Sequence, residues 1–390
     1  MTLPNGLSAA VAARLPRFSY ELAALVNIDC GSYTPQGVNQ VADHVAGWLS
    51  ELGAAVERIP HRPAEGEAPL GDLLIGRIPG TGPRLLLIGH MDTVFDPGTA
   101  AARPYRTERR RAFGPGVTDM KGGLLAGLHA IAALHALDRQ PSITFVANPD
   151  EEIGSPFSTP RIRALAAEHD AAFVLECARA NGDIVSARKG IADYEITLTG
   201  RAAHAGVEPE KGRSAILEAA RQVIALHALN GRWPGVTLNA GMIQGGTRPN
   251  VVAAQCRIEL DLRATTVAAF DTAATAVEEL VTHPGLDGVS ATLRRIAGHP
   301  PMEKSAAGAR LVALAQEIAT ELGFAVNDAA TGGASDANTT SAAGLPSLDG
   351  LGPVGGDDHS VDEWLDLDSI VPRTALLAGL LARAGEALGR

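Results

Sequence analysis

The stretch that most constrains the fold is residues 84–95, RLLLIGHMDTVF. Four consecutive aliphatic residues, Leu85 to Ile88, predict a strand that is buried on both faces, and polar residues begin where that strand ends. In open α/β sheets, ligands bind at the carboxyl ends of the strands. His90 and Asp92 stand at this position, so the stretch predicts one part of a functional site.

The composition argues against several classes of protein. At 390 residues the chain is long for one hydrophobic core, which favours two domains. Its formal net charge of −11 argues against a nucleic acid or an anionic membrane as partner, although a bound metal can still attract an anionic small substrate. Three widely spaced cysteines suit a reducing compartment, and we find neither a secretory signal nor a membrane-spanning apolar run. We therefore expect a cytoplasmic protein.

The first half of the chain alternates between helical and strand-like patterns. Such alternation, with strands of the buried type, predicts an α/β domain with a mostly parallel central sheet flanked by helices. The spacing of apolar residues predicts helices at 7–28, 32–53, 120–137 and 160–168, and strands at 54–59, 72–78, 84–89, 142–147 and 171–175.

The pattern changes near residue 190. The segment 194–199, YEITLT, alternates as a half-exposed strand should, and the elements then follow in the order βαββαβ. This order predicts a small ferredoxin-like domain, inserted at 190–298, with an antiparallel sheet and two helices on one face. Helix–strand alternation resumes after residue 299, with helices at 304–322, 336–343 and 367–387 and a strand at 345–351. We therefore expect a catalytic domain built from 1–189 and 299–390.

Polar side chains follow each expected strand of the large domain. Because the carboxyl ends of parallel strands meet at one edge of a sheet, we expect these residues to converge. They comprise His90 and Asp92, Asp119 at the start of a helix, Glu151 and Glu152, Glu176, and His359 in a glycine-rich loop.

Each of these residues has an ordinary structural explanation when taken alone. A single histidine after a strand is usually a satisfied loop residue, Asp119 could be a helix N-cap, and the pair Glu151 and Glu152 could be solvated surface. Glu176 is harder to explain in this way, because a carboxylate at the buried end of a strand needs a partner.

Taken together, the residues favour a metal centre. Imidazole and carboxylate ligands suit zinc and, with less discrimination, cobalt or manganese. Asp119, Glu152 and Glu176 supply about three negative charges and a hydroxide would add a fourth, which balances two divalent cations.

Several motifs, in their order along the chain, carry a family resemblance. They are GHMDTVF, GPGVTDMKGG, NPDEEIGS, the glutamate of VLE, GRAAHAG and DDHS, and they span roughly residues 84–360. In these motifs the chain resembles the co-catalytic zinc aminoacylase and carboxypeptidase family, which includes glutamate carboxypeptidase, acetylornithine deacetylase and succinyl-diaminopimelate desuccinylase. NPDEEIGS and HMDTVF are most similar to glutamate carboxypeptidase.

The resemblance implies a role for each residue of the metal centre. Asp119 would bridge two zinc ions, with His90 and Glu176 completing one site and Glu152 and His359 the other. Asp92 would orient the ring of His90, as its two-residue spacing permits. Glu151 would be the general base that takes a proton from the attacking water. From the residues alone, we expect only that neighbours on an extended segment point apart, so that one glutamate binds metal while the other faces the substrate.

The resemblance also implies residues in the inserted domain and beyond. His204 would stabilise the oxyanion across the interface of a homodimer. Asn250 would contact the substrate, Arg263 would bind its carboxylate, and Gly333 would belong to a glycine-rich loop that lines the pocket.

The function implied is a dizinc hydrolase that cuts an amide bond next to a free carboxylate and releases a C-terminal amino acid. An N-acyl-amino-acid deacylase or a dipeptidase with the same machinery is the alternative. Two positions depart from the family pattern. His299 stands where related enzymes often have an arginine, and Ile184 stands where glutamate carboxypeptidase has a pocket lysine, so both changes remove positive charge and weaken the case for a C-terminal glutamate. Arg188 and Lys189 are candidates to compensate for this loss of positive charge.

Two other classes fit less well. A dinucleotide-binding oxidoreductase needs a G-x-G-x-x-G motif that opens a helix after a strand, whereas Gly80 and Gly82 precede their strand. A non-catalytic peptide binder on the same fold would lack a metal ligand or the base, and here every one of them is present.

Overall fold

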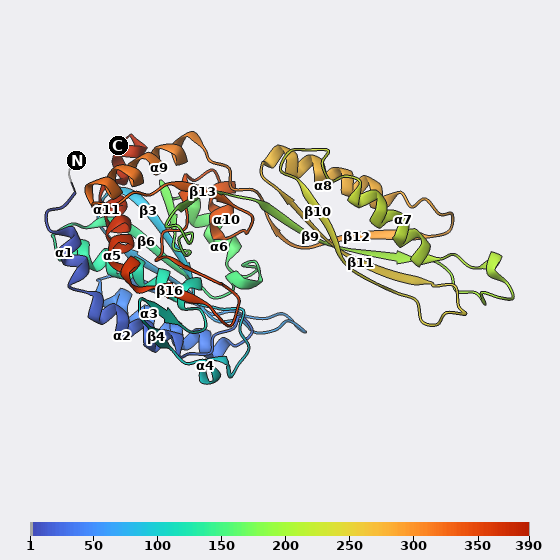
Figure 1. Ribbon diagram of the computed structural model, residues 1–390, viewed down its shortest axis with the longest axis horizontal. Helices are drawn as coiled ribbons and strands as arrows, with labels where there is room; N and C mark the ends of the chain where they lie inside the picture. The colour runs from blue at the N-terminus through green and yellow to red at the C-terminus, as the bar shows by residue number, and fades with distance from the viewer. Residues whose placement is uncertain (1–2, 390) are drawn as a thin grey trace. The chain divides into compact units, whose positions relative to one another are not determined.

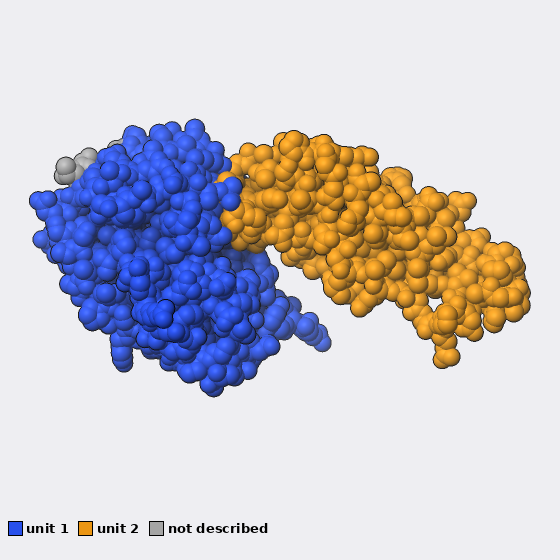
Figure 2. All heavy atoms as spheres, viewed as in Figure 1, with its two compact units in different colours: residues 1–186, 304–330, 335–390 blue, residues 187–303, 331–334 orange. Residues whose placement is uncertain are grey.

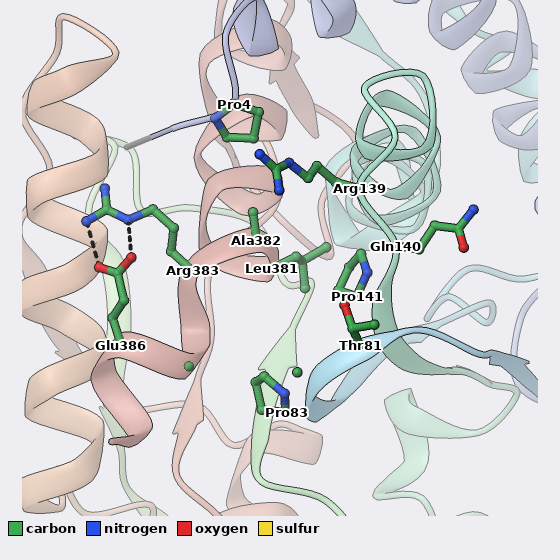
Figure 3. A pocket seen from close by; sticks show the side chains of 12 residues that line it. Pro4, Thr81, Pro83, Arg139, Gln140, Pro141, Leu381, Ala382, Arg383 and Glu386 are labelled. Carbon is green, nitrogen blue, oxygen red and sulfur yellow. Dashed lines mark hydrogen bonds and ion pairs between the residues drawn. The ribbon is translucent and has the colours of Figure 1, made fainter. Parts of the chain in front are cut away.

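The computed structural model describes residues 3–389, which form two compact units (Figure 2). Of the described residues, unit 1 contains 3–186, 304–330 and 335–389, and unit 2 contains 187–303 and 331–334. The unit borders lie a few residues from those that we expected at 190 and 298, and the short segment 331–334 joins unit 2 although it lies in the expected catalytic part.

A six-stranded mixed sheet forms the centre of unit 1 (Figure 1). Its strand order is β1-β2-β6-β3-β7-β14, and the four strands β6, β3, β7 and β14 run parallel to one another. Strand β2 runs antiparallel to both of its neighbours. The prediction of a mostly parallel sheet is therefore confirmed. The strands are β1 (Ala55–Ile59), β2 (Leu73–Ile78), β3 (Thr81–His90), β6 (Pro141–Asn148), β7 (Ala171–Val174) and β14 (Ser347–Leu348).

Helices cover both faces of this sheet, as the alternation along β6 shows. On one face, Phe145 lies opposite Gly76 of β2, and helices α3 (Pro35–Glu51) and α5 (Gly122–His135) pack there. A Cβ added to Gly127 of α5 would approach the ring of Phe145 to 2.9 Å, so the helix needs glycine at this contact. On the other face, Asn148 bonds to residues near α6 (Thr159–Ala166) and on α10 (Asp336–Ala342).

The remaining helices of unit 1 enlarge its hydrophobic core. The segment 7–28 forms two helices rather than one, because the helix stops at Ala12 and restarts at Leu15, with Pro16 in the new first turn. These helices are α1 (Leu7–Ala12), α2 (Leu15–Val26), α9 (Ala306–Glu321) and α11 (Ile370–Leu388). No described helix is long and apolar enough to cross a membrane.

A second small sheet forms where the sequence pattern predicted only a polar connection. Its strand order is β15-β16-β5-β4, and all of its pairings are antiparallel. The strands are two or three residues long, which is too short to give a period-two pattern. They are β4 (Arg106–Glu108), β5 (Arg111–Phe113), β15 (Gly355–Gly356) and β16 (Trp364–Asp366), with the short helix α4 (Thr99–Ala102) before them. Strands β8 (Ile184–Arg188) and β13 (Asp328–Thr331) form a further pair.

Unit 2 has the predicted βαββαβ order. Its four strands form an antiparallel sheet in the order β10-β11-β9-β12. Along β9, Tyr194, Ile196 and Leu198 are buried while their neighbours are partly exposed, so one face carries the core. Both helices pack against this sheet and contribute to the same core. The elements are β9 (Gly190–Thr199), α7 (Ala215–His227), β10 (Thr237–Gly245), β11 (Gln255–Ala264), α8 (Val267–Thr282) and β12 (Ser290–His299).

Candidate active site

The candidate site lies at the carboxyl edge of the parallel strands in unit 1. The register pairs His90 at the end of β3 with Asn148 at the end of β6, and Ile88 with Val174 of β7. Glu176 therefore follows its strand at the same edge as His90. All seven residues expected at this edge are joined by short contacts or lie in one donor cluster, namely His90, Asp92, Asp119, Glu151, Glu152, Glu176 and His359.

His90 is fixed from both sides of its ring. Its Nε2 lies 3.0 Å from Oδ1 of Asp119 and 3.7 Å from Oε1 of Glu176. Its Nδ1 lies 3.0 Å from the backbone carbonyl oxygen of Asp92 and 3.4 Å from the Asp92 carboxylate. The ring is almost fully buried. The second nitrogen of a metal-binding histidine ordinarily makes a contact of this kind, which orients the ring.

Asp119 lies in a turn and not at a helix N-cap. It belongs to the irregular turn Val117–Lys121, and the residue that caps α5 is Lys121. Glu363 holds this turn, because its carboxylate accepts hydrogen bonds from the backbone N–H groups of Gly116, Thr118 and Asp119, at 2.8, 2.9 and 3.1 Å. The Asp119 side chain is thereby free to face the two histidines.

His359 reaches the cluster from the loop that follows β15. Its Nε2 lies 3.1 Å from Oδ2 of Asp119 and 3.2 Å from Oε2 of Glu152. Its backbone φ of 60° lies in the left-handed region, which turns the loop back toward the sheet edge. Asp119 is therefore placed between the two imidazoles, with one carboxylate oxygen on each.

The two adjacent glutamates differ in their neighbours. They form a 3₁₀ turn, Glu151–Ile153, so the expectation of an extended segment with alternating side chains is wrong. Asp92 fixes this turn, since its carboxylate accepts the N–H groups of Glu151 and Glu152, each at 3.1 Å. Glu152 contacts His359, whereas Glu151 groups with His90 and Glu176.

Burial and mutual contacts shift the pKa of these groups strongly. Hydrogen bonds to Asp119 and Glu152 raise the pKa of His359 to about 11. Burial alone would raise the pKa of Asp119, but hydrogen bonds to His359 and His90 lower it overall. Burial raises the pKa of both Glu151 and Glu152. Of these three carboxyl groups, Asp119 is shifted toward the ionised form, and Glu151 and Glu152 are shifted toward the protonated form.

The donor set fits a divalent metal. Two groups of side chains, His90 with Glu151 and Glu176, and His90 with Asp119 and Glu152, bring their ligand atoms within 4.8 Å of one another. Imidazole nitrogen and carboxylate oxygen are ligands that zinc and similar cations prefer. Without a cation, protonated imidazoles are the positive partners of the carboxylates. A cation at this position would take over that role.

The expected residues His204, Asn250, Arg263 and Gly333 all lie in unit 2, where each makes or lies next to a contact with another residue of the unit. Ala205, next to His204, donates its N–H to the Asn250 carbonyl at 3.0 Å, and His204 bridges to Val251. Arg263 donates through Nη1 to the carbonyl of Gly332 at 2.9 Å and through Nε to Asp261. The Gly333 carbonyl accepts a hydrogen bond from Arg188 at 3.1 Å.

The two positions that depart from the family pattern are both buried. Ile184 belongs to the hydrophobic core of unit 1. His299 lies at the end of β12 and is 9% exposed. Arg188 and Lys189 were the candidates to replace the missing positive charge. Arg188 is 7% exposed and donates a hydrogen bond to the Gly333 carbonyl.

Sequence reasoning missed the residues that support the site. Glu363 is not among the residues that the sequence singled out, yet it is only 1% exposed. Arg373 of α11 was expected only as part of a helix. Its buried guanidinium donates to the carbonyls of Gly350 and Gly352, in the loop that leads toward His359. No local pattern reveals such residues, because their partners are backbone groups distant in the sequence.

Comparisons with known proteins agree with this geometry. Residues 86–383 match the model of peptidase family M20/M25/M40. Carboxypeptidase G2 of Pseudomonas sp. (strain RS-16) is 30% identical over 387 residues, which cover 98% of this chain and 92% of that protein. Acetylornithine deacetylase of Proteus mirabilis is 30% identical over 244 residues, 59% of this chain and 61% of that enzyme.

Solved structures show the same fold. Aminopeptidase PepT of Bacillus cereus is similar with a TM-score of 0.76 at 23% identity, covering 96% of this chain and 99% of that one. An M20 family metallo-carboxypeptidase of Sulfolobus solfataricus is similar with a TM-score of 0.74 at 16% identity, covering 94% and 98%. The chain therefore belongs to peptidase family M20/M25/M40 and is a metal-dependent hydrolase.

Proposed function

We propose that the protein is a dizinc hydrolase that cuts an amide bond next to a free carboxylate and releases a C-terminal amino acid. The observation that carries this proposal is the position of Asp119, whose two carboxylate oxygens face the rings of His90 and His359 at 3.0 and 3.1 Å. A carboxylate that is shared in this way suits a bridge between two cations. His90 and Glu176 would then hold one zinc ion, and Glu152 and His359 the other, with cobalt or manganese as substitutes.

Bound there, the two cations would acidify a water and polarise the scissile carbonyl. Glu151 takes a proton from that water and later passes it to the leaving amine. Its position supports this role, because its carboxylate lies in one donor cluster with His90 and Glu176 and makes none of the short contacts to His359 that Glu152 makes. The carboxylate of Asp92 keeps Glu151 in place by accepting a hydrogen bond from the backbone N–H of Glu151.

The substrate-binding residues that we propose belong to unit 2. Arg263 binds the free carboxylate, since a guanidinium matches the two oxygens of a carboxylate. Asn250 and Gly333 contribute further contacts. His204 donates to the developing oxyanion from the second subunit of a homodimer. We also keep the expectation of a cytoplasmic protein.

The leading candidate within this class is a carboxypeptidase that removes C-terminal glutamate. It is supported by the full-length similarity to carboxypeptidase G2. The second candidate is an N-acyl-amino-acid deacylase or dipeptidase, which the similarity to acetylornithine deacetylase favours.

A hydrolysis screen of the zinc-loaded protein tests the proposal. The screen varies the C-terminal residue and the acyl group independently and includes folyl- and acyl-glutamates, while elemental analysis counts the metal ions per chain. We expect two ions per chain and release of the C-terminal amino acid. Cleavage of neutral conjugates without any glutamate conjugate would exclude the glutamate preference, and a failure to cleave any amide would exclude the proposal.

A further inference from the structure

Unit 1 carries a concentration of arginines that the proposed mechanism does not use. Five arginines lie between residues 103 and 111, in a chain whose formal net charge is −11. They sit on and beside the β4–β5 hairpin, whose turn places Arg109 at a left-handed φ of 54°. We call Arg103, Arg106, Arg109, Arg110 and Arg111 the arginine face.

Three of these arginines are stacked on aromatic rings. The guanidinium carbon of Arg103 lies 4.7 Å from the ring centre of Phe95, that of Arg106 lies 4.0 Å from Phe113, and that of Arg111 lies 3.8 Å from Trp364. Stacking supports one flat side of a guanidinium and leaves its N–H edge free to donate. These side chains are therefore held in place before any ligand binds, which lowers the entropic cost of binding.

The positive charge of the arginine face is only partly neutralised. Arg110 pairs with Asp368 at 2.6 Å and lies 3.7 Å from Asp366, and Arg106 lies 3.4 Å from Glu108. The side chains of Arg110 and Arg106 are both more than half exposed. Among residues 3–389, Arg103, Arg109 and Arg111 make no ion pair with a carboxylate. The face therefore keeps an excess of positive charge.

The arginine face is connected to the loop that carries His359. Arg103 donates through Nη1 to the carbonyl of Ser360 at 3.1 Å. Trp364, on which Arg111 is stacked, donates through Nε1 to Asp357 at 2.9 Å. Ser360, after His359, thus contacts Arg103 directly. Asp357, before His359, contacts the Trp364 ring on which Arg111 is stacked.

We propose that the arginine face binds carboxylates on the acyl portion of the substrate, so that the enzyme prefers acidic peptides or acyl groups with additional carboxylates. This proposal rests on the proposed function, in which unit 2 recognises the amino acid that is released. The acyl portion then remains without a partner, and the positive face beside the His359 loop suits it by charge. A nucleic acid fits less well, because the rest of the chain is acidic and would repel a long polyanion.

Two substrates that share their C-terminal amino acid test the proposal. One carries a neutral acyl group and the other an acyl group with two additional carboxylates. For the wild type we expect kcat/KM to be about tenfold higher for the acidic substrate at low salt, and this preference should shrink as ionic strength rises. The triple variant Arg103→Gln, Arg106→Gln, Arg111→Gln should lose the preference while still cleaving the neutral substrate.

A matched control removes the same charge elsewhere on unit 1. Arg77, Arg161 and Arg163 are exposed residues outside the arginine face, and the variant with glutamine at all three positions should keep the preference. Equal preference in the wild type and the first triple variant would overturn the proposal while leaving the proposed function intact, because the neutral substrate is still cleaved.

If no amide substrate is cleaved, a binding measurement tests whether the arginine face binds carboxylates. Calorimetric titration with an N-acetylated triglutamate amide should show binding to the wild type at low salt and a loss of about tenfold or more in the Arg103, Arg106, Arg111 variant. Equal binding by the two proteins, or binding of a short oligonucleotide as tightly as the peptide, would overturn the proposal.

Discussion

At the residue scale, Asp92 links the two halves of the candidate site. Its carboxylate accepts hydrogen bonds from the Ser32 hydroxyl and from the N–H groups of Glu151 and Glu152, and its backbone carbonyl lies against His90. A single buried side chain therefore fixes both the ring of a metal-ligand candidate and the backbone of the candidate base. A change at Asp92 would disturb both, whereas changes at the two glutamates separate their roles.

Replacing Glu151 with glutamine should separate catalysis from metal binding. The change keeps the size of the side chain but removes its ability to take a proton. We expect zinc content near that of the wild type and a fall in kcat of about 10²–10⁴-fold, as measured by elemental analysis and steady-state kinetics. Glu152→Gln is the matched control and should lose zinc, because Glu152 contacts His359. Turnover retained by the Glu151 variant would contradict its role as the base.

At the element scale, the Val117–Lys121 turn depends on Glu363. Glu363→Ala should leave three N–H groups of the turn without their acceptor, at least one of them buried. We expect the free energy of unfolding to fall by about 2–3 kcal/mol, measured by urea denaturation of the metal-free protein so that metal binding does not contribute. Asp362→Ala changes an exposed neighbour and should alter stability little. An equal loss in the two variants would show that the turn does not need Glu363.

Helices α9 and α11 are joined by a buried arginine with three acidic partners. Arg383 contacts Glu317, Glu321 and Glu386, and its hydrogen bonds lower the pKa of Glu386 to about 2. Because the folded state favours the ionised carboxylate, Glu386 stabilises the fold above its ordinary pKa of 4.5, and this contribution disappears as the pH falls toward 2.

We therefore expect Glu386→Gln to lower the melting temperature by about 2 °C at neutral pH. As the pH falls to about 2, the melting temperatures of the wild type and the variant should converge. Thermal unfolding followed by circular dichroism across this pH range measures the difference. Glu65→Gln, at an exposed loop position, is the control and should show no such pH dependence. A difference in melting temperature between the wild type and Glu386→Gln that does not change with pH would contradict the conclusion that the ionised Glu386 carboxylate stabilises the fold.

The length of an element decides whether the sequence could predict it. Long buried strands such as β3 and β6 have continuous apolar runs, and polar residues directly after them, such as His90, were therefore found. The strands β4, β5 and β16 are too short to have a pattern. Glu363 was missed because its partners are backbone groups, which have no sequence signature. The 3₁₀ turn at Glu151–Ile153 was missed because it is fixed by Asp92, which follows β3 and lies about 60 residues away in the sequence.

At the scale of the whole molecule, unit 2 has an exposed apolar surface that suits self-association. Strand β10 is an edge of the sheet and exposes Met242 and Ile243, and helix α7, which packs against it, exposes Leu217 and Ile224. An exposed edge strand with apolar side chains favours pairing with another chain. These features support the proposed homodimer through unit 2, in which His204 serves the site of the other subunit.

Subunit mixing tests both the dimer and the position at which His204 acts. Glu151→Gln and His204→Ala should each be almost inactive alone. If His204 acts across the interface, a heterodimer of the two variants combines an intact Glu151 from one chain with an intact His204 from the other, which restores one of its two sites. We therefore expect activity to appear on mixing under conditions that exchange subunits, with dimer formation followed by analytical ultracentrifugation. Recovery should be absent when Glu151→Gln is mixed with the double variant. A dimer whose mixed variants stay inactive would mean that His204 serves its own chain or has no role in the reaction.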